Sequence, residues 1–237
     1  MYSDVFCKVY DAFGWNYYPE AFGQQMLQWL QNHGLQLRRC LDLGCGTGIL
    51  CRILHSCCPD VWGMDLSEGM IRIARENDRK SHYAVGDMVT YRPEGRFDLV
   101  TCTGDALNHI ASPEALAQIF ENVYGYLAPG GYFIFDILNE KEVSDSEPFE
   151  MDFDEHTKVW FQMTCPQPRS VNLHIRVYEN DELQLEEIIR ETVHHPQQIC
   201  QMLQQQGFAV EKCDHRLLED QDTQATTWFV IARKQVD

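Results

Sequence analysis

The pattern of hydrophobic and polar positions divides this chain into segments of different kinds. Between residues 38 and 137, short apolar runs alternate with segments whose apolar positions repeat with the period of a helix. The runs predict strands at 38–43, 60–65, 82–86, 96–102 and 131–137, and the periodic segments predict helices near 48–57, 67–77 and 112–127. Buried strands that alternate with helices predict a parallel sheet covered on both faces.

The flanking segments follow other patterns. Residues 19–31 carry apolar positions on one helical face and stop before Gly34, which predicts a helix with a glycine end. Polar and apolar residues alternate from 149 to 195, which predicts antiparallel strands with a turn at 179–182. The last predicted elements are a helix at 196–207 and a strand pair at 208–216 and 225–234.

Together these elements predict an α/β fold with a doubly wound, Rossmann-like sheet of about seven strands. The sheet is expected to be mostly parallel, with an antiparallel terminal hairpin and an inserted antiparallel β subdomain. The chain then has four parts, which are an N-terminal helical flap (1–33), a core (34–138), the insertion (139–195) and a C-terminal helix and hairpin that complete the core (196–237). The insertion is the expected substrate wall.

The stretch LDLGCGTG, residues 41–48, joins the first predicted strand to the helix that follows it. Its glycines adopt positive φ freely and let a ligand approach the backbone, and the helix start leaves N–H groups free for that ligand. The next strand ends in Asp65, 19 residues after Gly46. That spacing is close to the one at which a carboxylate reaches ribose hydroxyls, so the stretch predicts a nucleoside site.

Acidic residues follow four of the predicted strands. Asp65, Asp87, Asp105 and Asp136 stand at or just after the ends of strands two to five. Aspartate is common in turns because its side chain bonds nearby backbone groups. Ligands of doubly wound sheets, however, bind outside the carboxyl ends of the strands, and four carboxylates on that edge beside a nucleoside loop are seldom accidental.

The motifs LDLGCGTG, MDLSEGM, GDM and LAPGGYFIFD stand in the order and at the spacing of class I S-adenosylmethionine (SAM) dependent methyltransferases, which this chain resembles over residues 5–138. The resemblance implies that SAM is the cofactor and S-adenosylhomocysteine the product, with Asp65 on the ribose hydroxyls and Asp87 on the adenine amino group. It also places these residues at the cofactor: Tyr18, Gly44, Cys45, Gly46, Thr47, Gly48, Leu66, Met88, Thr103 and Gly104.

Two further stretches resemble small-molecule N-methyltransferases. Residues 9–13, with the tyrosine pair that ends in Tyr18, are similar to the opening segment that closes over SAM in those enzymes, and DALNHI, residues 105–110, is similar to a segment of aminosugar N-methyltransferases that carries an active-site His or Tyr. The likeness implies a polar ring of Tyr10, His109 and Asp136 over the methyl group. A histidine pKa of about 6.5 suits proton removal at neutral pH, although a loop histidine bonded to backbone explains His109 equally well.

Composition indicates which kinds of partner and cofactor the protein is expected to bind. The chain has 36 acidic and 19 basic residues, a formal charge of −17, and this field would repel nucleic acid. Its ten cysteines show no C-x-x-C spacing, which favours free thiols in a reducing compartment over a metal or disulfides. His194 and His195 are adjacent, so in a strand they point to opposite faces, and no metal site is expected. No apolar run approaches about 20 residues. We therefore expect a cytoplasmic protein, without membrane or nucleic-acid partners, as a monomer or homodimer.

The sequence thus predicts an enzyme that transfers a methyl group from SAM to a small molecule, with an amine as one candidate acceptor. Trp160, His174 and Arg176 are candidate contacts from the insertion, although a solvated strand face explains each of them more simply. The alternative is a catalytically silent SAM-binding protein that acts as a regulatory or partner subunit. An NAD-dependent dehydrogenase is a third interpretation, disfavoured because the glycines follow G-x-G-x-G and not G-x-G-x-x-G.

Overall fold

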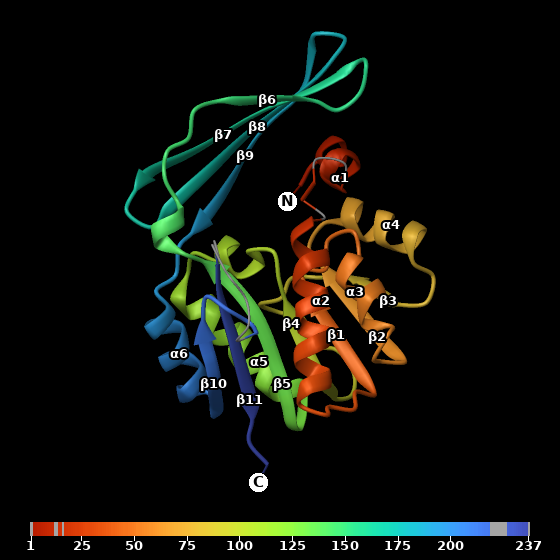
Figure 1. Ribbon diagram of the computed structural model, residues 1–237, viewed down its shortest axis with the longest axis vertical. Coiled ribbons are helices and arrows are strands. Elements are labelled where there is room, and N and C mark those ends of the chain that lie inside the picture. Colours follow the sequence, from red (N-terminus) through yellow and green to blue (C-terminus); the bar gives the residue numbers. More distant parts are fainter. Residues whose placement is uncertain (1, 12–13, 16, 219–226, 237) are drawn as a thin grey trace.

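A computed structural model of the chain describes residues 2–11, 14–15, 17–218 and 227–236. Its centre is a seven-stranded sheet with the strand order β10-β11-β5-β4-β1-β2-β3 (Figure 1). Its parallel strands are β1 (Arg39–Leu43), β2 (Asp60–Asp65), β3 (His82–Val85), β4 (Phe97–Cys102) and β5 (Leu127–Leu138). The hairpin of β10 (Phe208–Asp214) and β11 (Thr227–Lys234) adds two antiparallel strands at one edge.

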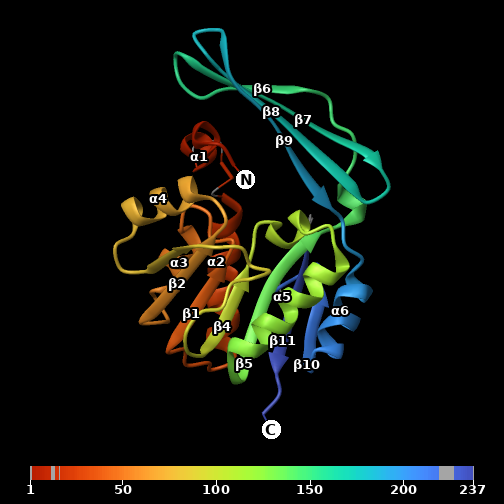
Figure 2. The ribbon, with the colours of Figure 1, turned by 180° about the vertical axis from the view of Figure 1, so that it is seen from behind.

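Helices cover both faces of this sheet (Figures 1 and 2). One face packs against α2 (Tyr17–Asn32), α3 (Ile49–Leu54) and α4 (Glu68–Asn77), and the other against α5 (Pro113–Tyr126) and α6 (Pro196–Gln205). Side chains along β5 alternate between the two faces. Ile134 packs on the side of α2, α3 and α4, whereas Phe133 and Phe135 pack on the side of α5 and α6. The doubly wound fold predicted from the sequence is confirmed.

Local signals in the sequence explain where helices begin and end. Ser67 and Ser112 cap α4 and α5, since their hydroxyls accept the backbone N–H of Met70 at 3.3 Å and of Ala115 at 3.2 Å. The helix predicted at 19–31 is α2, and Gly34 follows its end with a φ of 62°. These boundaries depend on short-range interactions, which is why the sequence predicts them well.

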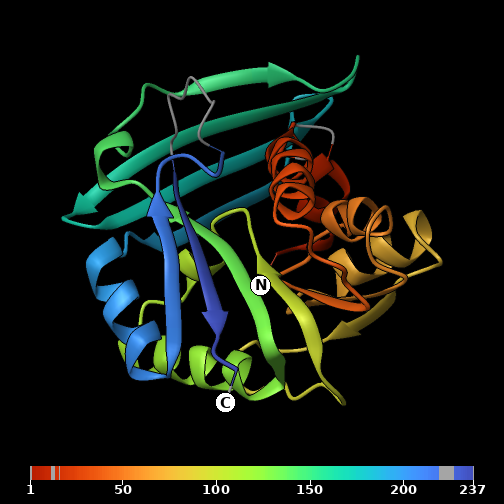
Figure 3. The same cartoon turned by 60° about the horizontal axis from the view of Figure 1, so that its bottom comes forward.

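The insertion forms a separate four-stranded antiparallel sheet, which lies across the carboxyl ends of the central strands (Figures 1 and 3). Its strands are β6 (Phe149–Asp152), β7 (Thr157–Gln167), β8 (Ser170–Glu179) and β9 (Glu182–Thr192). The predicted turn between β8 and β9 is confirmed, with Asn180 and Asp181 at φ values of 51° and 64°. The apolar face of this sheet, with Val159 and Ile175, packs against Phe6 and Val9 of α1 (Asp4–Tyr10).

The structure differs from the sequence prediction at three places. Helix α1 was not predicted, although Ser3 caps it by accepting the N–H of Phe6 at 3.2 Å. β5 begins at Leu127 and not at 131, because Leu127 already pairs with Phe97 before the register shifts. Of the loop predicted between the last two strands, residues 219–225 lie outside the described residues.

Candidate functional site

The glycine loop joins β1 to α3 and exposes bare backbone. Gly44, Gly46 and Gly48 all have positive φ, at 69°, 51° and 80°, a region that residues with a side chain seldom adopt. A Cβ at Gly46 would meet nothing within 4 Å, whereas one at Gly48 would overlap the ring of Tyr83. The loop is therefore packed tightly on its protein side at Gly48 and open at Gly46.

Asp65, at the end of β2, connects the glycine loop to the next helix. Its carboxylate accepts the backbone N–H of Gly46 at 2.9 Å and that of Ser67 at 2.8 Å. Burial raises the pKa of Asp65 above its ordinary value, while these backbone hydrogen bonds act in the opposite direction. Asp65, the residue predicted to bind the ribose hydroxyls, thus lies beside the open glycine loop.

The loop after β4 mirrors this arrangement. Gly104 has a φ of 69° with no atom within 4 Å of an added Cβ, and Asp105 has a φ of 59°. Asp136 of β5 is completely buried and accepts the N–H groups of Gly104 at 3.0 Å and Asp105 at 3.2 Å. Burial, followed by the charge of Asp105, raises the pKa of Asp136. Asp136 therefore holds the shape of this loop, and its predicted catalytic role stays a prediction.

A cavity of about 110 Å³ separates the two loops. Its lining comes from the glycine loop, the loop after β4 and the N-terminal segment: Tyr10, Trp15, Tyr18, Pro19, Asp42, Gly44, Cys45, Gly46, Thr47, Ile49, Leu50, Thr103, Gly104 and Asp105. Eight of the fifteen predicted site residues are among them, which places the bulk of the prediction around one space. The Thr47 hydroxyl donates to the Asp11 carboxylate at 2.6 Å and links the N-terminal segment to the glycine loop.

The predicted adenine side lies outside this cavity. Leu66 is 49% exposed and Asp87 is exposed, with its carboxylate accepting the N–H of Val89 at 2.9 Å. Met88 is half-buried against the core formed with α5. These residues follow β2 and β3, which pair directly, so they lie on the same edge of the sheet as Asp65. Their roles at the adenine ring stay predictions.

His109 ends the short helix η2 (Ala106–His109) and faces the N-terminal segment. Its Nε2 hydrogen-bonds to the Tyr2 hydroxyl at 3.1 Å and lies 3.9 Å from Oε1 of Glu191. Burial lowers the pKa of His109, which favours the neutral imidazole. Tyr10 lines the cavity next to Trp15, with ring centroids 5.4 Å apart. The catalytic roles of His109 and Tyr10 stay predictions, and residues 12–13 of the opening segment lie outside the described residues.

Several residues at the site were missed from the sequence. Asp105 follows a strand end and was noticed there, but not assigned a role. Trp15 stands between Tyr10 and Tyr18, the two aromatic residues selected in the N-terminal segment, and Glu191 belongs to an alternating strand that carries many charges. Trp160 and Arg176, two of the insertion residues singled out from the sequence, lie on the opposite strand face from Val159. The Arg176 Cζ atom stacks 4.5 Å from the centroid of the Trp160 ring. They therefore do not belong to the face that packs on α1.

Asp42, in the middle of β1, is buried and accepts the Thr101 hydroxyl at 2.7 Å. Burial raises its pKa to about 7. The native protein keeps the Asp42 proton up to about pH 7, whereas the unfolded chain loses it near pH 4. The free energy of unfolding should therefore fall by up to about 1.4 kcal/mol per pH unit as the pH rises from 4 to 7. Asp42→Asn should reduce that decline, as denaturant unfolding at pH 5 and 8 would show. An equal effect at both pH values would contradict this assignment.

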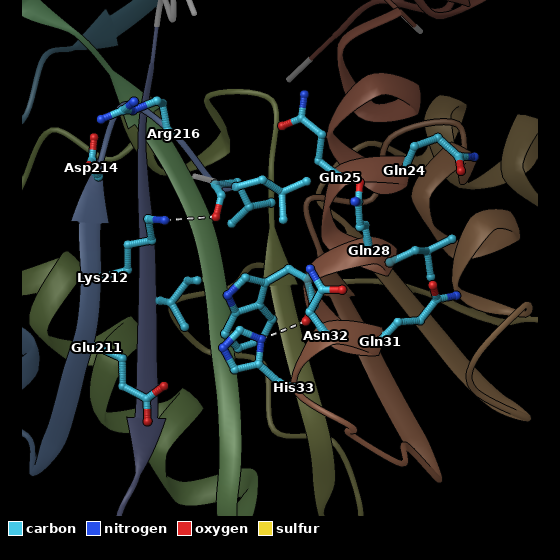
Figure 4. A pocket seen from close by; sticks show the side chains of 15 residues that line it. Gln24, Gln25, Gln28, Gln31, Asn32, His33, Glu211, Lys212, Asp214 and Arg216 are labelled. Carbon is cyan, nitrogen blue, oxygen red and sulfur yellow. Dashed lines mark hydrogen bonds between the residues drawn. The ribbon is translucent and has the colours of Figure 1, made fainter. Parts of the chain in front are cut away.

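A larger cavity, of about 1380 Å³, lies between α2 and the β10–β11 hairpin, away from the glycine loop (Figure 4). Polar side chains of α2, including Gln25, Gln28 and Asn32, face Lys212 and Arg216 across it. Lys212 donates to the carbonyl of Leu217 at 3.0 Å. None of the predicted site residues lines this cavity, so its size alone does not identify it as the active site.

The two adjacent histidines make separate contacts. His194 hydrogen-bonds to the Leu107 carbonyl at 3.2 Å, while His195 caps α6. Among the residues that the structure describes, no three His, Cys, Asp or Glu side chains gather as metal ligands. Within the same residues, no helix is both long and apolar enough to cross a membrane.

The seven-stranded sheet, with its last strands antiparallel and a nucleoside-type glycine loop after β1, defines the class I SAM-dependent methyltransferase fold. Residues 40–131 match the family model described as a methyltransferase domain, a family whose cofactor is SAM.

Relatives in sequence include methyltransferases of different acceptors. A ubiquinone biosynthesis O-methyltransferase from Bordetella avium is 35% identical over 52% of this chain and 53% of its own length. A dTDP-3-amino-3,6-dideoxy-alpha-D-glucopyranose N,N-dimethyltransferase from Streptomyces fradiae is 29% identical over 57% of this chain and 54% of its own length. The chain thus spans about half the length of the curated relatives it matches.

Solved structures match over nearly the whole chain. A SAM-dependent methyltransferase from Clostridium acetobutylicum aligns with a TM-score of 0.79 and 22% identity, covering 90% of each chain. A SAM-bound amino pentose methyltransferase from Micromonospora echinaspora aligns with a TM-score of 0.78 and 20% identity, covering 99% of this chain and 98% of its own. At these identities the likeness shows the fold alone.

Proposed function

We propose that this protein transfers the methyl group of SAM to a small-molecule acceptor. The observation that carries the proposal is the pair of open loops. Gly46 and Gly104 both have positive φ, both line the same cavity, and at neither would a Cβ meet an atom within 4 Å. Two stretches of bare backbone that face one cavity leave room for a ligand to run along them.

The residues present fit SAM. Asp65 offers a half-buried carboxylate beside the glycine loop, and the carboxyl oxygen Oδ1 of Asp105 is buried without a hydrogen-bond partner among the described residues. Negative groups suit a cofactor whose methyl group is carried by a positively charged sulfur. Tyr10, Trp15 and Tyr18 border the cavity from the N-terminal side, where they would exclude water from the reacting centre.

The chemistry required of the protein is mainly alignment. The acceptor's lone pair forms a bond to the methyl carbon while the carbon–sulfur electron pair stays on sulfur. Holding the reactants in line and in contact can lower the barrier by several kcal/mol. A base is needed only where the acceptor carries a proton on its reacting atom at neutral pH.

A small molecule is the acceptor class that the surroundings favour. The chain carries a net charge of −17, which disfavours nucleic acid, and the insertion places β9 against α1 and η2 near the cavity. Among small molecules we favour an amine, because the relatives include an aminosugar N,N-dimethyltransferase and the site is rich in carboxyl groups. A SAM-binding protein without activity is the second candidate, and the same fold would serve it.

Calorimetric titration of the purified protein with SAM, S-adenosylhomocysteine and NAD tests the cofactor. We expect micromolar binding of both sulfur nucleosides and none of NAD. Methyl transfer from labelled SAM to a panel of amines, phenols and alcohols, read by mass spectrometry, then tests the activity. Binding of NAD alone would overturn the proposal, and SAM binding with no methylated product would favour the silent protein.

A further inference from the structure

Glu191 lies on the face of the insertion that is turned toward the core. β9 presents Glu187, Ile189 and Glu191 on one face, since side chains alternate along a strand. Ile189 is 7% exposed and packs in the cluster that includes Phe6 of α1. The Glu191 side chain is 13% exposed, so the insertion brings a largely buried carboxyl group to the interface with the N-terminal segment.

Glu191 has little to balance a negative charge. Its described ion-pair partner is His109, at 3.9 Å, and burial lowers the pKa of that histidine. Neither lysine nor arginine lies within ion-pairing distance of Glu191 among the described residues. Burial, followed by the charge of Asp105, raises the pKa of Glu191 to about 8. A buried carboxyl group without a cation is costly when ionised, so a cationic ligand would gain binding free energy there.

The position of Glu191 relative to the cavity is held by the fold. The Asn108 side chain donates to the carbonyl of Thr192 at 2.7 Å and accepts the N–H of Leu138 at 3.1 Å. One completely buried amide therefore ties both ends of the insertion to the segment that carries His109. Glu191, next to Thr192, interacts electrostatically with Asp105 and Tyr10, and both of these line the cavity.

We propose that Glu191 binds the ammonium group of an amine acceptor and takes its proton before methyl transfer, a role that rests on the proposed function. In that step the N–H bond breaks, its electron pair stays on nitrogen as the lone pair, and the proton forms an O–H bond with a Glu191 oxygen. The carboxylate becomes neutral and the amine becomes a nucleophile. The unpartnered oxygen of Asp105 gives the ammonium a second carboxyl contact on the cavity side.

Charge linkage gives this role a pH signature. An ammonium ion binds the carboxylate form, so binding should tighten as pH rises from 7 toward 8.5, by up to tenfold per unit below the pKa of Glu191. The groups that face Glu191 are His109 of η2, Asp105 of the loop after β4, and Tyr2 and Tyr10 of the N-terminal segment. His109 titrates below this window, both tyrosines titrate above it, and Asp105, with a pKa of about 6, also ionises below it.

The experiment compares binding of matched amines and alcohols to the protein saturated with S-adenosylhomocysteine. Calorimetry would use benzylamine against benzyl alcohol, glucosamine against glucose, and putrescine against 1,4-butanediol. We expect at least one amine to bind at least tenfold more tightly than its alcohol. Glu191→Gln should remove that preference and its pH dependence while leaving S-adenosylhomocysteine affinity within about twofold, and Glu191→Asp should restore part of the preference.

Glu187→Gln is the matched control, because Glu187 lies on the same face of the same strand and accepts the Ser3 N–H at 3.5 Å. It should keep the amine preference. If no amine exceeds its alcohol, or if Glu191→Gln keeps the preference, the role of Glu191 is wrong. Failure of S-adenosylhomocysteine to bind at all would instead refute the proposed function, so the two failures are distinguishable. Thermal unfolding of each variant checks that the fold is intact.

Discussion

Replacing Asp65 with asparagine is expected to weaken the binding of S-adenosylhomocysteine at least about 100-fold, or about 2.7 kcal/mol. The carboxylate accepts two backbone N–H groups, from Gly46 and Ser67, one on each oxygen. An amide keeps one acceptor and turns an NH₂ group toward the other N–H, and hydrogen bonds to a charged group contribute about 1.5–3 kcal/mol each. The substitution therefore disturbs the glycine loop and the predicted ribose contact together.

Calorimetry with S-adenosylhomocysteine measures this effect. Asp60→Asn is the matched control, since Asp60 stands at the opposite end of the same strand, where it pairs with Arg39 at 2.9 Å. That variant should bind within about twofold of the parent protein. An Asp65→Asn variant that folds normally and keeps its affinity would show that the cofactor does not occupy the glycine loop.

Replacing Asp136 with alanine is expected to lower the free energy of unfolding by about 2–4 kcal/mol and to weaken S-adenosylhomocysteine binding at least about tenfold. The completely buried carboxyl group accepts the N–H groups of Gly104 and Asp105, and each buried donor left without an acceptor costs about 1–3 kcal/mol. Asp105 and Gly104 hold positive φ, so the loop should lose its shape when these bonds are lost.

Asp98→Ala provides a close comparison. Asp98 also accepts two backbone N–H groups, of Arg38 at 2.7 Å and Arg39 at 3.0 Å, but at the amino end of β1. Denaturant unfolding should show a loss of stability in both variants, and calorimetry should show a loss of affinity in Asp136→Ala alone. If Asp136→Ala keeps stability and affinity but loses methyl transfer, Asp136 has the catalytic role predicted from the sequence and not the positioning role that its contacts indicate.

The sequence predicted some residues of the candidate site better than others. The glycine loop and Asp65 follow from residues close in sequence, and the structure brings Gly46 and Asp65 to 2.9 Å. Asp136 was identified correctly as a residue of this edge, but its complete burial depends on how β5 and the loop after β4 pack. Whether a strand-end carboxylate faces a ligand or caps a loop is decided by that packing, which local patterns do not contain.

The insertion shows the limit of periodicity as a guide. Alternation along 149–195 predicts antiparallel strands. The pattern does not say which of the two faces of the resulting sheet packs against the rest of the protein. Trp160, His174 and Arg176 were selected by side-chain type, and Trp160 and Arg176 form a stack on the outer face together with Glu186. Glu191 lies on the inner face because Ile189 beside it is buried against α1.

By itself the sequence determined the strand and helix order, the doubly wound core, the glycine loop and the SAM-dependent class. Each of these depends on period, turn residues and caps, which act between residues near one another in the chain. Only the tertiary structure decided that Asp136 supports a loop, that the inner face of β9 and not the outer one meets the core, and that Glu191 lies 3.9 Å from His109. Those facts depend on contacts between residues that are far apart in the sequence. Their pairing is fixed only when the apolar faces of the insertion, α1 and the core are buried together.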